Sequence, residues 1–310
     1  MIFSKIFDPV DSKSLLGFDE NFDFFNKLIL GKKFPKVVLL TGEKGSGKFT
    51  FINHFMHFYF DSDKYDFKNK VFLEKTTFHT QFKNNVFPNI FYLRGADFQN
   101  IKIEDIRILK EKLLNTPIIN DKRFIILDDV DSFNLNSLNA LLKLIEEPSI
   151  NNHFILINNK SKNLLATIKS RCLELKIIFN NKKKEKIINS LIKVFNQNIF
   201  LEMDLVNLSP GNYLKYNHFF GENKMNLKSN FLENVKIIFK IYKKEKDIFF
   251  KDLLIFLSEY YFQSHLKNNF VNSTNLLDKR LNILENIDNF FVYNLNQNSL
   301  LNSIEKNIYE

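Results

Sequence analysis

The sequence contains a single cysteine, no tryptophan and no long apolar run. One cysteine excludes a disulfide framework and a four-cysteine zinc module. Apolar stretches such as Leu253 to Leu257 are well short of a membrane span, and the start, Met1 to Asp8, lacks the layout of a signal peptide. We therefore expect a cytoplasmic protein that has no zinc and no membrane partner.

Phenylalanine and basic residues are abundant instead. The 36 phenylalanines predict a phenylalanine-rich core, and a hydrophobic content of 45% supports a packed globular protein. A length of 310 residues suits two or three domains. The net charge of +9 permits a nucleic-acid partner, although a solvated lysine-rich surface accounts for the same charge.

A glycine-rich loop follows the apolar run Val37 to Leu40 and precedes a second apolar segment. Its glycines and lysine fit the phosphate-binding pattern G-x-x-x-x-G-K. Glycines let successive backbone N–H groups face one point, and the N-terminus of the next helix adds partial positive charge. ATP or ADP is therefore expected to bind, with the lysine reaching the terminal phosphates. The binding residues would be Gly42, Gly45, Ser46, Gly47 and Lys48.

The position after Lys48 departs from the pattern. The motif has Ser or Thr there, whose hydroxyl binds Mg²⁺, but this chain has Phe49, with Thr50 one position late. A phenyl ring cannot ligate a metal. We therefore expect a site that binds nucleotide, with Thr50 beside it, and uses Mg²⁺ poorly.

A second apolar run, Phe124 to Leu127, ends in the carboxylates Asp128 and Asp129. An unbroken apolar run fits a strand of a parallel sheet, whose terminal acids would stand beside the phosphate loop as in a Walker B motif. Asp128 would orient Mg²⁺. Asp129 takes the position where a glutamate normally polarises the attacking water, and its side chain is one methylene shorter.

The remaining pattern predicts further elements. Strands are expected at 90–93, 154–159 and 173–175, and helices at 21–30, 103–114, 136–147 and 164–169. Residues 61–89 have no clear pattern, whereas 231–310 are helical in pattern. His54 and His57 lie one helical turn apart among phenylalanines, which favours packing or a solvated face over metal binding.

Three stretches together resemble the clamp-loader branch of AAA+ ATPases. They are Asp128-Asp129-Val130-Asp131, the run N-A-L-L-K-L-I-E-E-P from Asn139 to Pro148, and Thr167-Ile168-Lys169-Ser170-Arg171-Cys172. The resemblance implies an α/β fold, in which an AAA+ P-loop parallel sheet flanked by helices is followed by a small helical lid and an all-helical C-terminal collar. It implies a nucleotide-binding core at 1–178, a lid at 179–222 and a collar for oligomerisation at 223–310.

The same resemblance implies roles for two more residues. Asn159 falls on sensor 1, and Arg171 falls on the arginine finger that reaches the nucleotide of a neighbouring subunit. An ion pair within its own domain is the alternative role for Arg171.

Within this branch the chain is similar to the delta-prime subunits. Phe49, Asp129 and Asn212, which stands in place of the sensor 2 arginine, all depart from the tau/gamma motor subunits. The resemblance implies a clamp-loader subunit with weak or absent ATPase activity that takes part in ATP-dependent loading of the sliding clamp onto primed DNA. Its partners would be tau/gamma and delta subunits in a hetero-pentamer, the sliding clamp, and primer-template DNA through the complex.

Several alternatives stay open. The chain could be a catalytically active tau/gamma-type motor, or an unrelated P-loop kinase or nucleotide-binding regulator. The run Lys182 to Lys184 could touch DNA, but a solvated first turn is the simpler interpretation. A helical stripe in the C-terminal part fits either an ordinary core or a collar face; it consists of Leu277, Leu281, Leu284, Ile287 and Phe291.

Overall fold

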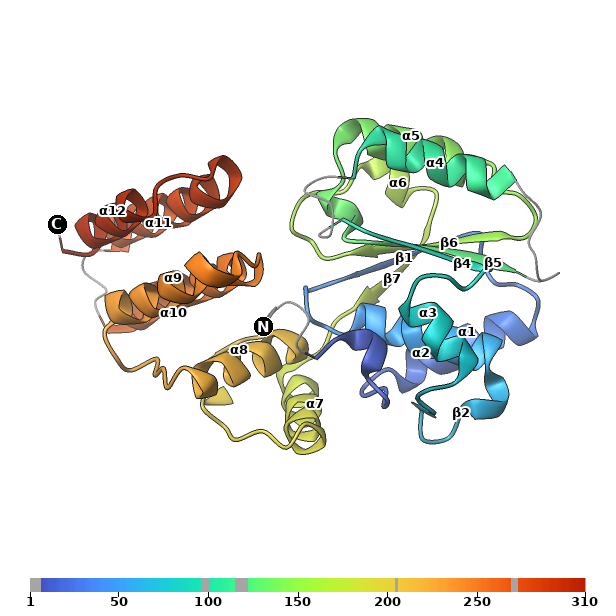
Figure 1. Ribbon diagram of the computed structural model, residues 1–310, viewed down its shortest axis with the longest axis horizontal. Coiled ribbons are helices and arrows are strands. Elements are labelled where there is room, and N and C mark those ends of the chain that lie inside the picture. The colour runs from blue at the N-terminus through green and yellow to red at the C-terminus, as the bar shows by residue number, and fades with distance from the viewer. Residues whose placement is uncertain (1–6, 96–100, 115–121, 204–205, 269–272, 310) are drawn as a thin grey trace. The chain divides into compact units, whose positions relative to one another are not determined.

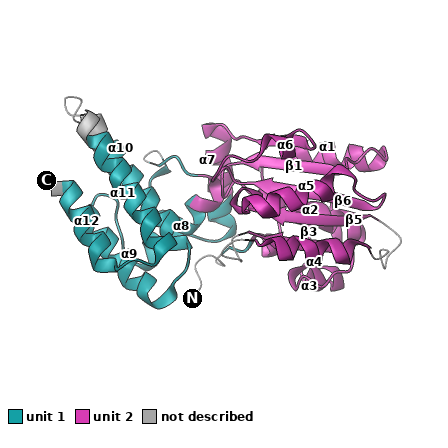
Figure 2. Ribbon diagram, turned by 90° about the horizontal axis from the view of Figure 1, so that it is seen from above, with its two compact units in different colours: residues 1–8, 191–208, 213–310 teal, residues 9–190, 209–212 magenta. Residues whose placement is uncertain are grey.

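The structure is a computed structural model that describes residues 7–95, 101–114, 122–203, 206–268 and 273–309. It divides into two compact units (Figure 2). One comprises residues 9–190 with 209–212, and the other comprises residues 1–8, 191–208 and 213–310. Residues of the predicted lid, 179–222, fall in both units, so the division into core, lid and collar stays a proposal.

A five-stranded parallel sheet forms the centre of the first unit (Figure 1). Because all strands run in the same direction, their carboxyl ends meet at one edge. The strand that leads into the glycine-rich loop lies between two others, which places the loop at that edge with a strand on either side. The strand order is β4 (Ile90–Arg94), β5 (Arg123–Asp128), β6 (Asn152–Asn158), β1 (Val37–Gly42) and β7 (Leu173–Ile177).

Both faces of the sheet are buried at its three inner strands, β5, β6 and β1, which is why these strands are apolar at successive positions. Alternate side chains point to opposite faces, so Val38 and Ile126 belong to one core and Val37 and Ile125 to the other. Helices α1 (Asp19–Leu30), α2 (Lys48–Phe60) and α3 (Thr77–Lys83) cover the first face, and α4 (Ile103–Leu114), α5 (Leu135–Glu146) and α6 (Ala166–Lys169) cover the second (Figure 1).

The core between the sheet and α1, α2 and α3 is rich in phenylalanine, as the composition predicts. Phe25 and Phe51, for example, meet edge to face with their ring centroids 4.8 Å apart. Such pairs add about 0.5–1.5 kcal/mol each beyond the area that they bury. Aromatic packing therefore holds the helix of the glycine-rich loop, α2, against the sheet.

The predicted strands and helices of the first unit are confirmed to within a few residues. The sequence showed no clear pattern at 61–89, and the structure has α3 and a hairpin of β2 (Tyr65–Asp66) and β3 (Val71–Phe72) in this segment. Strands of two residues are too short to show a period of two. The signal that was missed is the cap of α3, where the side chain of Thr76 accepts from the His79 N–H at 3.0 Å.

The second unit is helical, and α7 (Asn181–Val194) and α8 (Pro210–Glu222) each include residues of both units. It continues with α9 (Phe231–Glu245), α10 (Phe249–Asn268), α11 (Ser273–Tyr293) and α12 (Gln297–Tyr309). Among the helices that the structure describes, none is both long and apolar enough to cross a membrane.

The predicted apolar stripe of α11 is only partly buried. Ile283 and Ile287 are buried, whereas Leu277 and Leu281 are 43% and 57% exposed. Leu277 and Ile283 are six positions apart, which is about 120° around a helix with 3.6 residues per turn. The buried face and the exposed leucines therefore lie on different sides of α11.

Candidate nucleotide-binding site

The glycine-rich loop links the carboxyl end of β1 to the N-terminus of α2. Gly45 and Gly47 have φ angles of +80° and +87°, a region that glycine adopts without strain. A Cβ on Gly42 would lie 2.6 Å from the carbonyl oxygen of Ile177 on β7. The three motif glycines are therefore required by the backbone of the loop itself.

Lys48 lies inside this loop and is 3% exposed. Its ammonium donates to the carbonyl oxygens of Gly42 and Glu43 at 2.9 and 2.7 Å, and to Ser46 Oγ at 3.3 Å. Burial lowers the pKa of Lys48 to about 8, and the nearby acids oppose that shift. The three donors of the ammonium are matched by three acceptors of its own loop, which a bound phosphate would have to share or replace.

The acids predicted from the sequence lie at the same edge of the sheet, where β5 ends. Asp128 accepts a hydrogen bond from the N–H of Asp129 at 2.9 Å. Burial raises the pKa of the Asp128 carboxyl well above its usual range, and the charge of Asp129 raises it further. Burial therefore disfavours the charged form of the Asp128 carboxyl.

Asp129 is held between two side chains. Asn159 Nδ2 donates to Asp129 Oδ1, and Arg94 Nε lies 3.5 Å from Asp129 Oδ2. Asn159 is in turn positioned by Asp131, whose Oδ1 accepts from the Asn159 N–H at 2.9 Å. The structure thus brings Asp128, Asp129 and Asn159 together, and their roles at a nucleotide stay a prediction. The sequence analysis missed Arg94. Arg94 follows the predicted strand at 90–93, just as Asp128 follows the apolar run Phe124 to Leu127.

The residues present do not fit a magnesium ion. Phe49 is 8% exposed, and its ring centroid lies 4.7 Å from that of Tyr92. The Tyr92 hydroxyl donates to Asp128 Oδ2 at 3.3 Å. Thr50 is half-buried one position later on α2, about 100° around the helix axis from Phe49. An aromatic contact thus stands where the motif supplies a metal ligand, and Asp128 already has a protein partner.

The other groups of the described residues offer no substitute. In those parts of the chain, no cluster of three or more His, Cys, Asp or Glu side chains could hold a metal ion. His54 and His57 are buried, as the packing interpretation predicted. The His57 ring stacks on Phe72 with centroids 3.9 Å apart, and His54 Nε2 lies 2.8 Å from the Ser12 carbonyl oxygen. Burial lowers the pKa of His54 to about 4 and that of His57 to about 3.

Arg171 lies between α6 and β7, away from the glycine-rich loop. One guanidinium nitrogen is 2.7 Å from Glu146 Oε1, and another donates to the Thr167 carbonyl oxygen at 2.9 Å. The ion pair with Glu146 is the intradomain contact that the sequence left open. In the parallel pairing of β1 and β7, Gly42 stands beside Ile177 at the far end of β7, four residues beyond Leu173.

That pairing separates Arg171 from its own loop. Four residues of strand span about 13 Å, and Arg171 precedes even the first of them. The guanidinium of Arg171 therefore does not reach a phosphate on the loop of its own chain. Its role as an arginine finger stays a prediction.

Two segments outside the motif contact the loop. The side chain of Asn212, at the predicted sensor 2 position, lies against Gly45, where a Cβ would come within 2.6 Å of Asn212 Oδ1. Lys184 was expected to be solvated, but its side chain is 12% exposed and its ammonium lies 3.0 Å from Glu43 Oε2. The expectation failed because spacing within α7 gives no sign of an acid in a distant loop.

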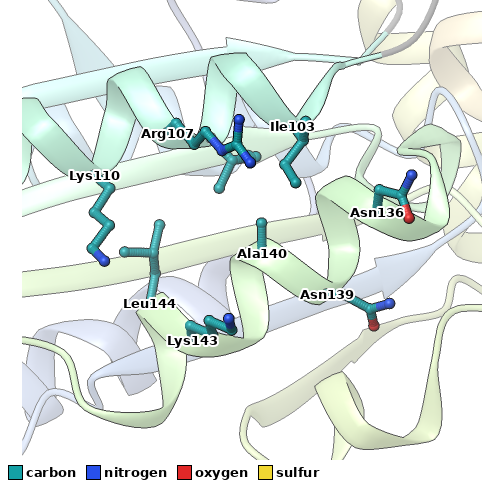
Figure 3. Close-up of a pocket in the computed structure, with 9 residues that line it drawn as sticks. Ile103, Arg107, Lys110, Asn136, Asn139, Ala140, Lys143 and Leu144 are labelled. Carbon is teal, nitrogen blue, oxygen red and sulfur yellow. The ribbon is translucent and has the colours of Figure 1, made fainter.

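A cavity of about 330 Å³ lies between α4 and α5 (Figure 3). Arg107 and Lys110 of α4 line it together with Asn136, Asn139 and Lys143 of α5. Arg107 also lies 3.2 Å from Glu104 Oε1 on its own helix. Three cations and two amides are groups that can hold a phosphate ester. Sequence reasoning missed this set because its members come from two helices.

The sheet order and the site define the class of this chain as a P-loop core of the AAA+ type, with the loop on β1 and the acids on the next strand but one. The sequence model of the family described as "DNA polymerase III, delta subunit" matches residues 18–181, slightly more than half of the chain. The chain belongs to this family.

Individual relatives match over shorter stretches. The chain is 33% identical over 88 residues to DNA polymerase III subunit delta' of Pseudomonas aeruginosa, covering 28% of this chain and 27% of that one. It is 30% identical over 133 residues to subunit delta' of Buchnera aphidicola subsp. Schizaphis graminum, covering 37% and 40%. A gamma subunit of the same Buchnera is 36% identical over 90 residues, covering 29% and 24%. The chain thus spans about a quarter to two fifths of the length of these relatives.

One solved structure aligns with most of the chain. The DNA polymerase III gamma subunit-related protein of Thermotoga maritima covers 92% of this chain and 98% of its own, with 17% identity and a TM-score of 0.47.

Proposed function

We propose that this chain is a delta-prime-like subunit of a bacterial replicase clamp loader with weak or absent ATPase activity of its own. In the cytoplasm it would join tau/gamma and delta subunits in a hetero-pentamer that loads the sliding clamp onto primed DNA. The observation that carries the proposal is a family match over a P-loop core in which Phe49 and Tyr92 meet where a metal ligand is needed.

The site lacks three requirements of phosphoryl transfer. Catalysis of this step is mostly positioning and charge stabilisation around the transferred phosphoryl group. Phe49 offers no metal ligand, Asp129 is engaged by Arg94 and Asn159, and Asn212 has no positive charge. Because each departure removes a different requirement, repairing one of them would not restore turnover.

Arg171 is proposed to act on the nucleotide of a neighbouring subunit. Its ion pair with Glu146 is at the surface, where the side chains are 37% and 44% exposed. Exposed pairs of this kind contribute about 0.2–1 kcal/mol, so a phosphate can replace the glutamate at small cost. An arginine supplied in trans stabilises the transition state and increases the rate at one site on the order of 10³–10⁵.

Two further surfaces support the proposed partners. Leu277 and Leu281 of α11 are exposed apolar side chains, which suit a collar contact with another subunit. The cations of the α4–α5 cavity suit the phosphate backbone of DNA held by the complex.

An active tau/gamma-type motor is the second candidate, and the intact pattern from Gly42 to Lys48 favours it. Steady-state ATPase of the purified chain, alone and with primed DNA, separates the two candidates. The delta-prime proposal predicts no turnover above that of a Lys48→Ala control, together with entry into a complex with tau/gamma and delta. Robust ATP turnover that is lost in the Lys48→Ala variant would show that the chain is an active motor subunit.

A further inference from the structure

Three consecutive residues of the glycine-rich loop each hold a group from a distant part of the chain. Glu43 Oε2 lies 3.0 Å from the Lys184 ammonium of α7. The Lys44 carbonyl oxygen accepts from Ser209 Oγ at 2.6 Å, and the Gly45 carbonyl oxygen accepts from the Gly211 N–H at 2.8 Å. We call these three contacts the clasp. They connect the loop to the starts of both α7 and α8.

The approach of the two backbones depends on glycine at two positions. A Cβ on Gly211 would lie 2.8 Å from the Gly45 carbonyl oxygen, and a Cβ on Gly45 would lie 2.5 Å from Ser209 Oγ. Ser209 is 4% exposed, so its hydroxyl is bonded to the loop out of contact with bulk water. A buried hydroxyl that loses its partner is destabilising, which fixes Ser209 on the loop.

The clasp requires no phosphate. Its acceptors are two backbone carbonyls and one carboxylate of the loop, and Lys48 is engaged by Gly42, Glu43 and Ser46. Asn212, where the family pattern has an arginine, carries no charge that would respond to a nucleotide. The contacts that position Ser209–Asn212 are therefore complete within the protein.

We propose that the clasp is a nucleotide-independent joint, in which the phosphate-binding loop serves as a docking platform that fixes the start of α8. It rests on the proposed function in one respect, namely that this P-loop is not a motor site. In a motor the residue at the sensor 2 position would contact the nucleotide, so its segment would be ordered by nucleotide. Here Ser209–Asn212 is held by hydrogen bonds to the loop itself, so its position should not change with the nucleotide.

Amide hydrogen exchange on the full-length chain tests the joint. The Gly211 N–H, bonded to Gly45, should be protected without nucleotide, and saturating ATP or ADP, with or without Mg²⁺, should leave its exchange rate unchanged. Gly211→Ala adds a Cβ that meets the Gly45 carbonyl. Because the residue lies in a helix, alanine suits its backbone. We expect exchange across 209–212 to become about tenfold faster or more in this variant.

Ser209→Ala is the milder variant, since it removes one hydrogen bond without adding an atom. It should speed exchange by about two- to tenfold, the contribution of one neutral hydrogen bond. Ser190→Ala is the matched control, because it removes a hydroxyl that bonds the Lys186 carbonyl oxygen on α7, away from the loop. Its exchange at 209–212 should equal that of the parent chain.

Two results would overturn the joint. One is rapid exchange at 209–212 without nucleotide that becomes protected when ATP is added. The other is exchange in Gly211→Ala and Ser209→Ala that equals the Ser190→Ala control. Neither depends on whether the chain enters a clamp loader, so a failure of the joint is distinguishable from a failure of the proposed function.

Discussion

Replacing Arg171 by alanine separates its proposed action on a neighbouring subunit from its ion pair within its own domain. Within its own domain, the guanidinium contacts Glu146 and the Thr167 carbonyl oxygen on a half-exposed surface. Losing a surface pair costs about 0.2–1 kcal/mol, which lowers the melting temperature by about 4 °C at most for a unit of this size. The isolated Arg171→Ala chain should therefore fold and assemble normally.

In the assembled complex the expected effect is much larger. A missing arginine finger slows one site on the order of 10³-fold or more. Bulk ATPase in the presence of clamp and primed DNA should fall only by the share of that site. Clamp loading should fall further if every site must turn over for one clamp to be released.

Glu146→Gln is the matched control, because it breaks the same ion pair and keeps the arginine. It should cost as little stability as Arg171→Ala and leave loading at the level of the parent complex. Equal losses of loading in the two variants would show that Arg171 acts through Glu146 within its own domain, and would refute the arginine finger.

Further predictions concern the loop, the core and the collar. Lys48→Ala should lower the stability of the chain by about 1–3 kcal/mol, because the buried carbonyl of Gly42 and the partly buried carbonyl of Glu43 lose their donor. A complex assembled with this variant should still load clamps at nearly the normal rate, and a large loss of loading would contradict a non-catalytic site. His54 and His57 have pKa values depressed to about 4 and about 3, so the stability that their neutral forms provide is complete above about pH 6.5 and is lost as pH falls below it. Denaturant titrations at pH 7.5 and 5.5 should show a loss of about 1.4 kcal/mol per histidine, and equal stability at the two pH values would contradict this. Leu277→Glu with Leu281→Glu should leave the melting curve of the isolated chain almost unchanged, because both side chains are exposed, and should weaken assembly in size-exclusion chromatography; unchanged assembly would remove α11 from the collar contact.

The sequence predicted the centre of the sheet because β5, β6 and β1 are buried on both faces. Runs such as Phe124 to Leu127 are apolar at every position, and each ends in the polar residue that reaches the site. The glycine-rich loop could be predicted equally well, because Gly45 and Gly47 adopt φ angles that few other residues tolerate.

Contacts between distant segments could not be predicted in this way. The pairing of Phe49 with Tyr92 joins residues on α2 and β4, and the clasp joins the loop to residues more than a hundred positions later. The spacing of apolar residues along the sequence does not indicate such pairs. The motif showed that Phe49 removes a metal ligand, but only the fold showed that Tyr92 then donates to Asp128.

Clamp loading by a reconstituted complex tests the central claim most directly. Tau/gamma and delta subunits, sliding clamp, ATP and primed DNA are mixed with and without this chain, and loaded clamps are counted on the DNA. The account predicts little loading without the chain, and full loading when either the parent chain or its Lys48→Ala variant is added. Loading that is the same without the chain, or that requires an intact Lys48, would contradict it.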